Sequence, residues 1–94
     1  MAINKDQRRK LKALAHHVAV FVNIGKQGLT EGVIYSINEK IEKDELIKIK
    51  FSHNKENKKI LSNEISTATK SEQVSLIGNI LTLYKQSRNL KNRH

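Results

Sequence analysis

Apolar residues recur along the chain with two kinds of spacing, which together predict three helices and four strands. Spacings of three and four residues indicate helices over about 5–17 and 55–69, and a further helix that begins at about Thr30 and ends before Asp44. Runs of β-branched or alternating apolar residues indicate strands over 18–24, 46–51, 73–77 and 80–84. Gly78-Asn79 is typical of a two-residue hairpin turn between the last two strands.

The resulting order, α-β-α-β-α-β-β, predicts an α/β (α+β) fold: one two-layer domain in which helices pack on a four-stranded mixed sheet. Each β-α-β passage is expected to make a parallel strand pair, and the hairpin an antiparallel one. Strand 46–51 alternates in polarity, with three apolar residues on one side and Lys48 and Lys50 on the other. One face of the sheet should therefore meet water.

The same spacing predicts which side chains form the core. The expected helical core positions are Leu11, Leu14, Ala15 and Val18, then Val33, Ile34, Ile37 and Ile41, then Leu61, Ile65 and Ala68. Of the four aromatic residues, Phe21 and Phe51 are expected in the core. Only Tyr35 and Tyr84 would then remain for stacking on bases, so contacts to nucleic-acid backbone and shape are expected instead of a sequence code.

Positive charge is concentrated near the two ends of a chain whose formal net charge is +9. Residues 1–12 contain five Lys or Arg and one Asp, and residues 85–94 contain four Lys or Arg and no acid. On the first helix, one row opposite the apolar side comprises Lys5, Arg9, Lys12 and His16. Like charges so placed repel one another, which favours a polyanionic partner. The alternative is a solvated, solubilising surface.

The loop Gly25-Lys26-Gln27-Gly28 joins the first strand to the second helix. Glycine lets a backbone approach a phosphate closely because it has no Cβ. The helix that Thr30 caps would direct unpaired N–H groups and its positive dipole end at the same place. The loop thus predicts an anion contact; the alternative is a tight turn that needs glycine sterically and binds nothing. Gly32, in the first helical turn, is interpreted as a point of close packing or of close approach by a ligand; the alternative is that glycine is simply tolerated near a helix end.

Other chemistry finds little support in the residues. The chain has no Cys, and the adjacent His16 and His17 would face about 100° apart on a helix, so no metal site is expected. We find no nucleophile–base pair or carboxylate dyad, and residues 25–30 lack the G-K-[ST] ending of a phosphate-binding loop. Neither an enzyme nor a cofactor is expected. No apolar run approaches the roughly 18 residues of a membrane span, which favours a cytoplasmic protein.

Four segments also carry a family resemblance: Lys12–His17, Val22–Val33, Glu45–Lys50 and Ile77–Tyr84. Over about residues 3–85 the chain resembles the CRM (chloroplast RNA splicing and ribosome maturation) proteins of the bacterial YhbY type. The resemblance implies a fold similar to the C-terminal domain of translation initiation factor three. The family often has a proline before the first strand, where this chain has Ala19-Val20, and a basic tail after Tyr84 is less typical of it.

The resemblance further implies an RNA-binding domain over residues 1–86. Residues 87–94 are polar and basic, and they are expected to form a flexible tail. Bacterial members are linked to precursors of the large ribosomal subunit, so a monomer that binds ribosomal RNA and assists assembly is expected. RNA contacts are expected at Gly25, Lys26, Gln27, Gly28 and Thr30 and on a neighbouring basic surface of the first helix, at Lys5, Arg9, Lys12 and His16. Lys55 and Lys59 would extend this surface or simply be solvated. The alternative function is a protein-interaction module that docks on a ribosomal protein or an assembly GTPase.

Overall fold

The computed structural model describes residues 3–53 and 55–86. Its elements follow the expected order: α1 (Lys5–Ala15), β1 (Val20–Ile24), α2 (Glu31–Asp44), β2 (Leu46–Phe51), the short 3-10 helix η1 (Lys55–Asn57), α3 (Lys58–Thr69), β3 (Glu72–Ile77) and β4 (Ile80–Tyr84). The expected tail over 87–94 lies outside the described residues. Several boundaries differ from the prediction. The largest differences are at α1, which ends at Ala15 instead of His17, at β1, which begins at Val20 instead of Val18, and at α3, which begins at Lys58 instead of about Lys55 because η1 precedes it. The end of α2 and the start of β3 differ by one residue.

The four strands form one mixed sheet in the order β1-β2-β4-β3. β1 is parallel to β2, and β4 is antiparallel to both β2 and β3. The expected mixed sheet is confirmed, but β2 and β3 are not the parallel pair that was predicted, because β4 lies between them. The hairpin turn contains Gly78 at a φ of +59°, a left-handed conformation that suits glycine. It returns the chain beside β3, and the other edge of β4 then pairs with β2.

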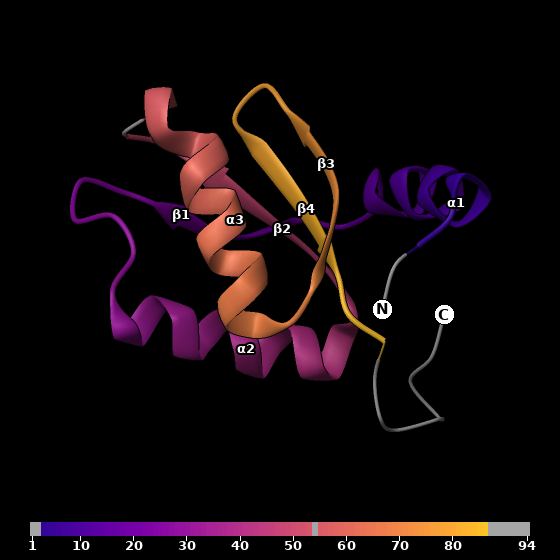
Figure 1. The fold of residues 1–94 in the computed structure, drawn as a ribbon, viewed down its shortest axis with the longest axis horizontal. Coiled ribbons are helices and arrows are strands. Elements are labelled where there is room, and N and C mark those ends of the chain that lie inside the picture. The colour runs from indigo at the N-terminus through magenta and orange to yellow at the C-terminus, as the bar shows by residue number, and fades with distance from the viewer. Residues whose placement is uncertain (1–2, 54, 87–94) are drawn as a thin grey trace.

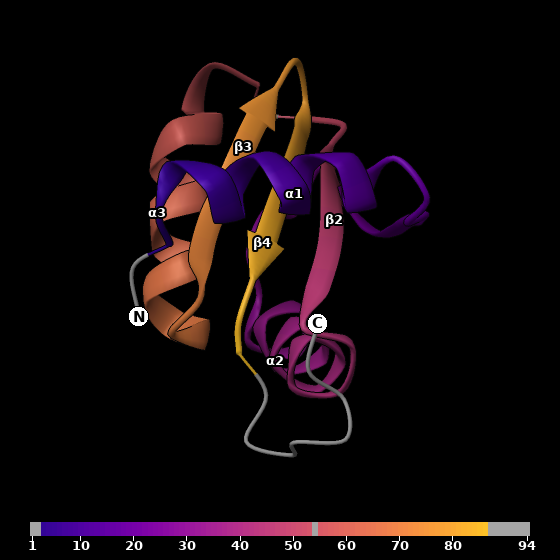
Figure 2. The ribbon, with the colours of Figure 1, turned by 90° about the vertical axis from the view of Figure 1, so that its right-hand side faces the viewer.

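Helices cover both faces of this sheet. In Figures 1 and 2, α2 and α3 lie against one face, and α1 crosses the other. The two-layer arrangement holds for α2, α3 and the sheet, and α1 adds a partial layer on the far side. The main core fills the space under α2 and α3 and comprises Ile24, Ile37, Ile41, Ile47, Ile49, Phe51, Ile65, Leu81 and Leu83. Each such side chain stabilises the fold by about 1.5–3 kcal/mol relative to an exposed one.

A second, smaller core holds α1 on the sheet. Its members are Ile3, Leu11, Ala15, Leu46, Val74 and Tyr84, with Val18 packed against them. This cluster covers only one end of the α1 side of the sheet. Along β2, Leu46 is buried beneath α1, whereas Lys48 is half-buried and Lys50 is exposed. The prediction that these two lysines face away from the main core is confirmed.

Several predictions about burial are wrong, each because of how the neighbouring elements pack. Leu14 is 44% exposed because α1 contacts the sheet through Leu11 and Ala15. Phe21 is 37% exposed at the point where the pairing of β1 shifts register, and the Lys40 ammonium lies 5.6 Å from its ring centroid. Tyr84, one of the two rings that remained as candidates for stacking on bases, is 6% exposed because β4 is a central strand whose end lies among the residues packed on α1.

The helix positions show the same mixture. Ile37, Ile41 and Ile65 are fully buried as predicted, but Ala68 is exposed. Gly32 is also exposed, and a Cβ built on it would meet only the Thr30 Oγ1 atom, at 3.9 Å. The packing interpretation of Gly32 is therefore wrong. Close approach by a ligand stays a prediction, and so does the simple tolerance of glycine near a helix end.

Capping determines where two of the helices begin. The Asn4 side chain accepts from the Gln7 amide at 2.8 Å, and the Gln7 side chain accepts from the Asn4 amide at 3.0 Å. This reciprocal capping box confirms the predicted start of α1. Thr30 Oγ1 likewise accepts from the Val33 amide at 3.1 Å, which confirms Thr30 as the N-cap of α2.

Arg8 ties α1 to an irregular point of the sheet. Its Nη1 atom donates to the Gln73 carbonyl at 2.7 Å and to the Val74 carbonyl at 2.8 Å. The register of β3 with β4 shifts between Gln73 and Ser75, so Val74 is the extra residue of a bulge. Arg8 therefore provides a charged hydrogen-bond donor to carbonyls at this bulge.

Replacing Arg8 with Ala should lower the free energy of unfolding by about 1.5–3 kcal/mol, because two hydrogen bonds from a charged donor are lost. The neighbouring Arg9 is exposed and provides a matched control. Arg9→Ala should change stability by no more than about 0.5 kcal/mol. Urea unfolding of both variants measures the difference, and equal losses would contradict the structural role of Arg8.

Candidate nucleic-acid interface

The Gly25–Gly28 loop forms a tight turn at the surface. It follows β1 directly, where Ile24 pairs with Phe51 of β2, and it closes with a hydrogen bond of 3.0 Å from the Gly28 amide to the Gly25 carbonyl. Lys26 and Gln27 are exposed, and both glycines are half-buried. The loop thus meets the first requirement of a ligand contact, since its backbone and its two central side chains are accessible.

The two glycines of the loop exist for different reasons. Gly28 has a φ of +69°, so the turn itself requires glycine there. Gly25 has no left-handed φ, and a Cβ built on it would meet nothing within 4 Å. The steric interpretation therefore explains Gly28 but not Gly25. A group outside the chain that approaches the backbone would explain a missing side chain at Gly25.

The amino end of α2 follows this loop. Thr30 Oγ1 satisfies the Val33 amide, and the amides of the first helical turn before it have no carbonyl of the helix to bond to. Together with the positive end of the helix dipole, these donors favour an anion. The exposed Glu31 carboxylate in the same turn opposes a second negative charge. The anion contact is therefore expected on the loop side of the helix end, toward Lys26.

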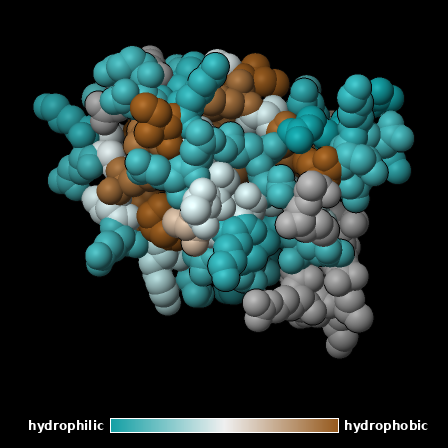
Figure 3. Space-filling model, viewed as in Figure 1, coloured by the Kyte–Doolittle hydropathy of each residue, from teal (hydrophilic) through white to brown (hydrophobic). Residues whose placement is uncertain are grey.

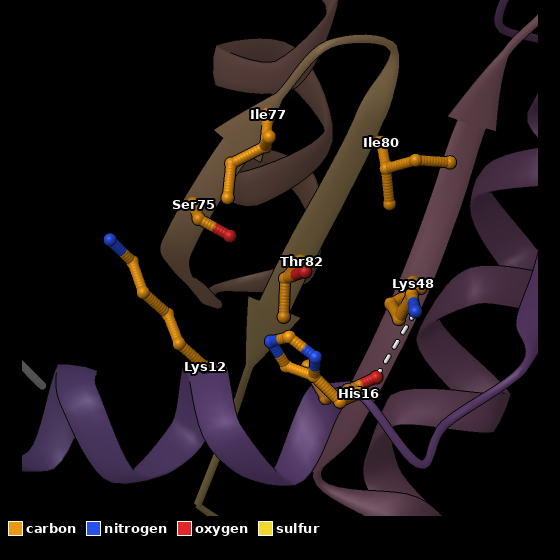
Figure 4. A pocket seen from close by; sticks show the side chains of 8 residues that line it. Lys12, His16, Lys48, Ser75, Ile77, Ile80 and Thr82 are labelled. Carbon is orange, nitrogen blue, oxygen red and sulfur yellow. Dashed lines mark hydrogen bonds between the residues drawn. The ribbon is translucent and has the colours of Figure 1, made fainter.

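The four cations of the α1 row are all exposed, but they do not share one environment. Lys12 and His16 lean over the sheet and line a groove there, together with Lys48 of β2 (Figure 4). The description of this row as a purely outer face is thus wrong for Lys12 and His16. The helix crosses the sheet, so one flank of its polar side lies above the strands.

The loop and the α1 row lie apart. Figure 1 shows α1 at one end of the long axis and the loop between β1 and α2 at the other, in a molecule that measures 36 Å along this axis. The sequence interpretation placed the two side by side, and the structure does not. A single ligand that touches both must cross the molecule.

Two rows of cross-strand neighbours connect these regions on the α1 side of the sheet. Because directly paired residues share a face, the strand register places Lys48, Thr82 and Ser75 in the row beside α1. It places Asn23, Lys50, Ile80 and Ile77 in the row nearer the loop. We call these seven residues the open sheet face. Asn23 lies two residues before Gly25, so the face leads from α1 to the loop.

Lys48 and Lys50 were recognised from the sequence as outward-facing but were not assigned to the RNA surface. Their signal was the alternation of β2, which showed that they face away from the core without showing what lies beside them. In the structure, the Lys48 ammonium donates to the Ala15 carbonyl at 3.1 Å. It thereby holds the carboxyl end of α1, where a cation is favoured, and brings its charge next to His16.

The remaining candidates fall outside this surface. Lys59 is exposed on α3, which covers the opposite face of the sheet. His17 is exposed, and Tyr35 is 66% exposed on α2. The Lys55 side chain and all of Arg88 and Arg93 lie outside what the structure describes.

Figure 3 shows how hydrophilic and hydrophobic residues are distributed over one face of the molecule. Hydrophilic atoms predominate at both ends of the long axis, where the loop and α1 lie, and hydrophobic atoms gather over α3, between α3 and α2 and over the β3–β4 hairpin, with a smaller patch beside α1. Residues 3–53 and 55–86 contain no group of three or more His, Cys, Asp or Glu suited to a metal ion. Within the same residues, no helix combines the length and apolar character needed to cross a bilayer.

Comparison with known proteins shows which family has this architecture. A family model, that of the CRS1 / YhbY (CRM) domain, matches residues 3–85. The chain belongs to the CRM domain family. Its resemblance to this family, stated above from four segments, is thereby confirmed.

Several proteins of other organisms are similar to this CRM domain over most of their length. An RNA-binding protein of Haemophilus influenzae is 41% identical over 90 residues, which span 95% of this chain and 91% of the relative. YqeI of Bacillus subtilis, named a probable RNA-binding protein, is 35% identical over 90% of each chain. The solution structure of the hypothetical protein SAV1595 from Staphylococcus aureus matches with a TM-score of 0.82 and 35% identity, over 99% of this chain and 98% of that one.

The loop geometry of this CRM domain predicts unequal effects of two alanine substitutions on folding. Gly28→Ala should lower the free energy of unfolding by about 1–2 kcal/mol, because an L-residue is strained at a φ of +69°. Gly25→Ala should leave stability unchanged or slightly raised, because nothing within 4 Å meets the new methyl group. Thermal and urea unfolding distinguish the two. If Gly25→Ala lowered the free energy of unfolding as much as Gly28→Ala, both glycines would be explained by the shape of the turn alone.

Proposed function

We propose that this CRM domain binds RNA, with the sugar-phosphate backbone running from the Gly25–Gly28 loop across the open sheet face to Lys12 and His16. The observation that carries the proposal is the surface position of Gly25, whose missing side chain nothing inside the chain explains. The family and the names of the relatives support RNA as the partner. Backbone contacts of this kind position an RNA strand without reading its sequence.

Each predicted residue then has a distinct part in the contact. Gly25 and Gly28 expose the turn, Lys26 and Gln27 supply a cation and a neutral donor, and Thr30 fixes the helix end behind them. At the other end of the surface, Lys12 and His16 act from the groove. Lys5 and Arg9 extend the contact along the exposed side of α1.

The dimensions indicate how much RNA is needed. With a rise of about 3.4 Å per stacked nucleotide, a molecule 36 Å long spans on the order of ten nucleotides. Shorter strands reach the loop or α1 but not both. Because the loop and α1 lie far apart, the expected ligand is a longer RNA strand and not a short clamped segment.

Gly25→Asp should weaken binding to a single-stranded RNA of about 12 nucleotides at least tenfold, equivalent to about 1.4 kcal/mol. The new carboxylate blocks close approach and repels phosphate, whereas folding has room for it. Affinity is measured by fluorescence anisotropy, and stability by urea unfolding of the same sample.

Thr67→Asp on α3 is the matched control, because it makes the same change of charge at an exposed position on the helix opposite the open sheet face. It should alter affinity less than twofold. For the unmodified chain, four to six neutralised phosphates predict that log K falls with log salt at a slope of about −3 to −5. Equal losses in the two Asp variants, or a flat salt response, would refute the proposed backbone contact.

We further propose that the RNA is ribosomal and that the chain assists assembly of the large ribosomal subunit as a cytoplasmic monomer. This part rests on the family resemblance alone. Among the described residues, the feature that favours a protein partner instead is the apolar groove between α2 and α3. It is lined by Leu29, Ile34 and Ala68 with the largely exposed Tyr35, and is bordered by Glu31 and Glu64.

In a sucrose gradient of cell extract, the chain should sediment with precursors of the large subunit and leave them as salt is raised, because phosphate contacts are screened. Nuclease digestion of the precursor should release it as well. Retention after complete digestion would favour a ribosomal protein or an assembly GTPase as the partner. Absence from the precursor fractions would contradict the ribosomal assignment while leaving RNA binding intact.

A further inference from the structure

The groove beside α1 has charged residues at one end and apolar residues at the other, and binding of an RNA backbone would contact only the charged end. It measures about 320 Å³ and is lined by Lys12, Ala15, His16, Lys48, Ser75, Ile77, Ile80 and Thr82. This volume lies at the lower end of the range of small-molecule sites. Three of the lining side chains are basic, and among the described residues that line it none is acidic. An anionic occupant is therefore favoured.

The lining residues are sorted along the groove (Figure 4). Lys12, His16 and Lys48 lie at its α1 end, and Ile77 and Ile80 lie toward the hairpin, with the Ser75 and Thr82 side chains between the two groups. The bulge of β3 produces part of this arrangement, because the extra residue Val74 enters the α1 core while Ser75 still faces Thr82. The groove thus runs from cationic through hydroxyl-bearing to apolar.

A nucleotide has the same order of groups, from phosphate through ribose to base. We propose that the groove holds one unstacked nucleotide of the bound RNA strand, its phosphate beside Lys12, His16 and Lys48 and its base against Ile77 and Ile80. This inference rests on the proposed RNA binding and adds to it a contact with a base. The half-buried Ser75 hydroxyl would donate to or accept from the ribose or the base edge, whereas Thr82 lines the groove but is only 4% exposed.

Exposure of the apolar end supports this occupant. Ile77 is 67% exposed on β3, and Ile80 is half-buried beside it. An aliphatic platform suits the face of a base, which every nucleotide presents, so the contact tolerates different sequences. A base paired in a duplex is stacked between its neighbours and cannot enter, so the groove selects single-stranded segments of the RNA.

Titration of the full ¹⁵N-labelled chain with adenosine 5′-monophosphate, ribose 5-phosphate and inorganic phosphate tests the groove directly. The adenosine nucleotide should shift the amide resonances of Ser75, Ile77, Ile80 and Thr82, whereas the two base-free probes should act mainly near Lys12 and His16. If all three probes shift the same resonances equally, or if the nucleotide leaves the Ile77 and Ile80 signals in place, the assignment of the base is overturned.

Variants then test the groove within RNA. Ile77→Glu should weaken binding of a single-stranded RNA of about 12 nucleotides at least fivefold, and Ile60→Glu, at a similarly exposed isoleucine on α3, less than twofold. Ile77→Thr serves if the Glu variant fails to fold, and it should weaken binding in the same direction. Neither Ile77 variant should change affinity for duplex RNA by more than Ile60→Glu does.

The two proposals fail in different ways. Equal affinities of the Ile77 and Ile60 variants, with Gly25→Asp still impaired, would overturn the groove and leave the backbone contact standing. Unimpaired binding by Gly25→Asp would refute the backbone contact at the loop. Saturation of the groove by free adenosine 5′-monophosphate at concentrations that leave RNA bound would contradict the assignment of this groove to the RNA strand.

Discussion

The packing of α1 across only one end of the sheet is the constraint on which the proposed surface depends. Leu11 and Ala15 bury against Leu46, Val74 and Tyr84, which fixes the helix at the start of β2. Two hydrogen-bonded cations reinforce this position, one from the helix to the β3 bulge and one from β2 to the carboxyl end of the helix. A longer or more apolar helix would cover the strands that here stay accessible.

Because α1 stops there, the sheet has two unequal faces. The face under α2 and α3 is filled by fully buried aliphatic side chains and Phe51, and it provides most of the hydrophobic stabilisation. The other face keeps lysines, hydroxyls and two accessible isoleucines. The same strands thus provide stability on one side and the proposed recognition surface on the other, since successive side chains of a strand point in opposite directions.

This geometry divides the proposed RNA recognition between two places. The glycine loop offers backbone amides and a helix end, and so suits phosphate; the groove beside α1 combines cations with an apolar platform, and so suits a whole nucleotide. Charge alone would not have separated these roles, because cations occur at both. The two places differ in their apolar groups: the groove has accessible isoleucine side chains, whereas the loop has glycines and so exposes its backbone.

Local patterns in the sequence were enough for the elements, their order and the Thr30 helix cap, because hydrogen-bonding and spacing rules act within a few residues. They also indicated the exposure of the glycine loop and of Lys48 and Lys50. They failed for Leu14, Phe21 and Tyr84, whose burial depends on which element happens to lie beside them. Helical spacing predicts which side of α1 is apolar, but it does not predict how much of that side the sheet buries.

The sequence by itself determined the secondary structure, the basic character and the family, since each is carried by residues near one another in the chain. Only the tertiary structure decided that β4 lies between β2 and β3, that the loop and α1 lie at opposite ends, and that a groove forms beside α1. These features depend on pairings between residues more than 25 positions apart, such as Lys48 with Thr82. Such pairings are chosen by the combined burial of the whole core, which no local pattern records.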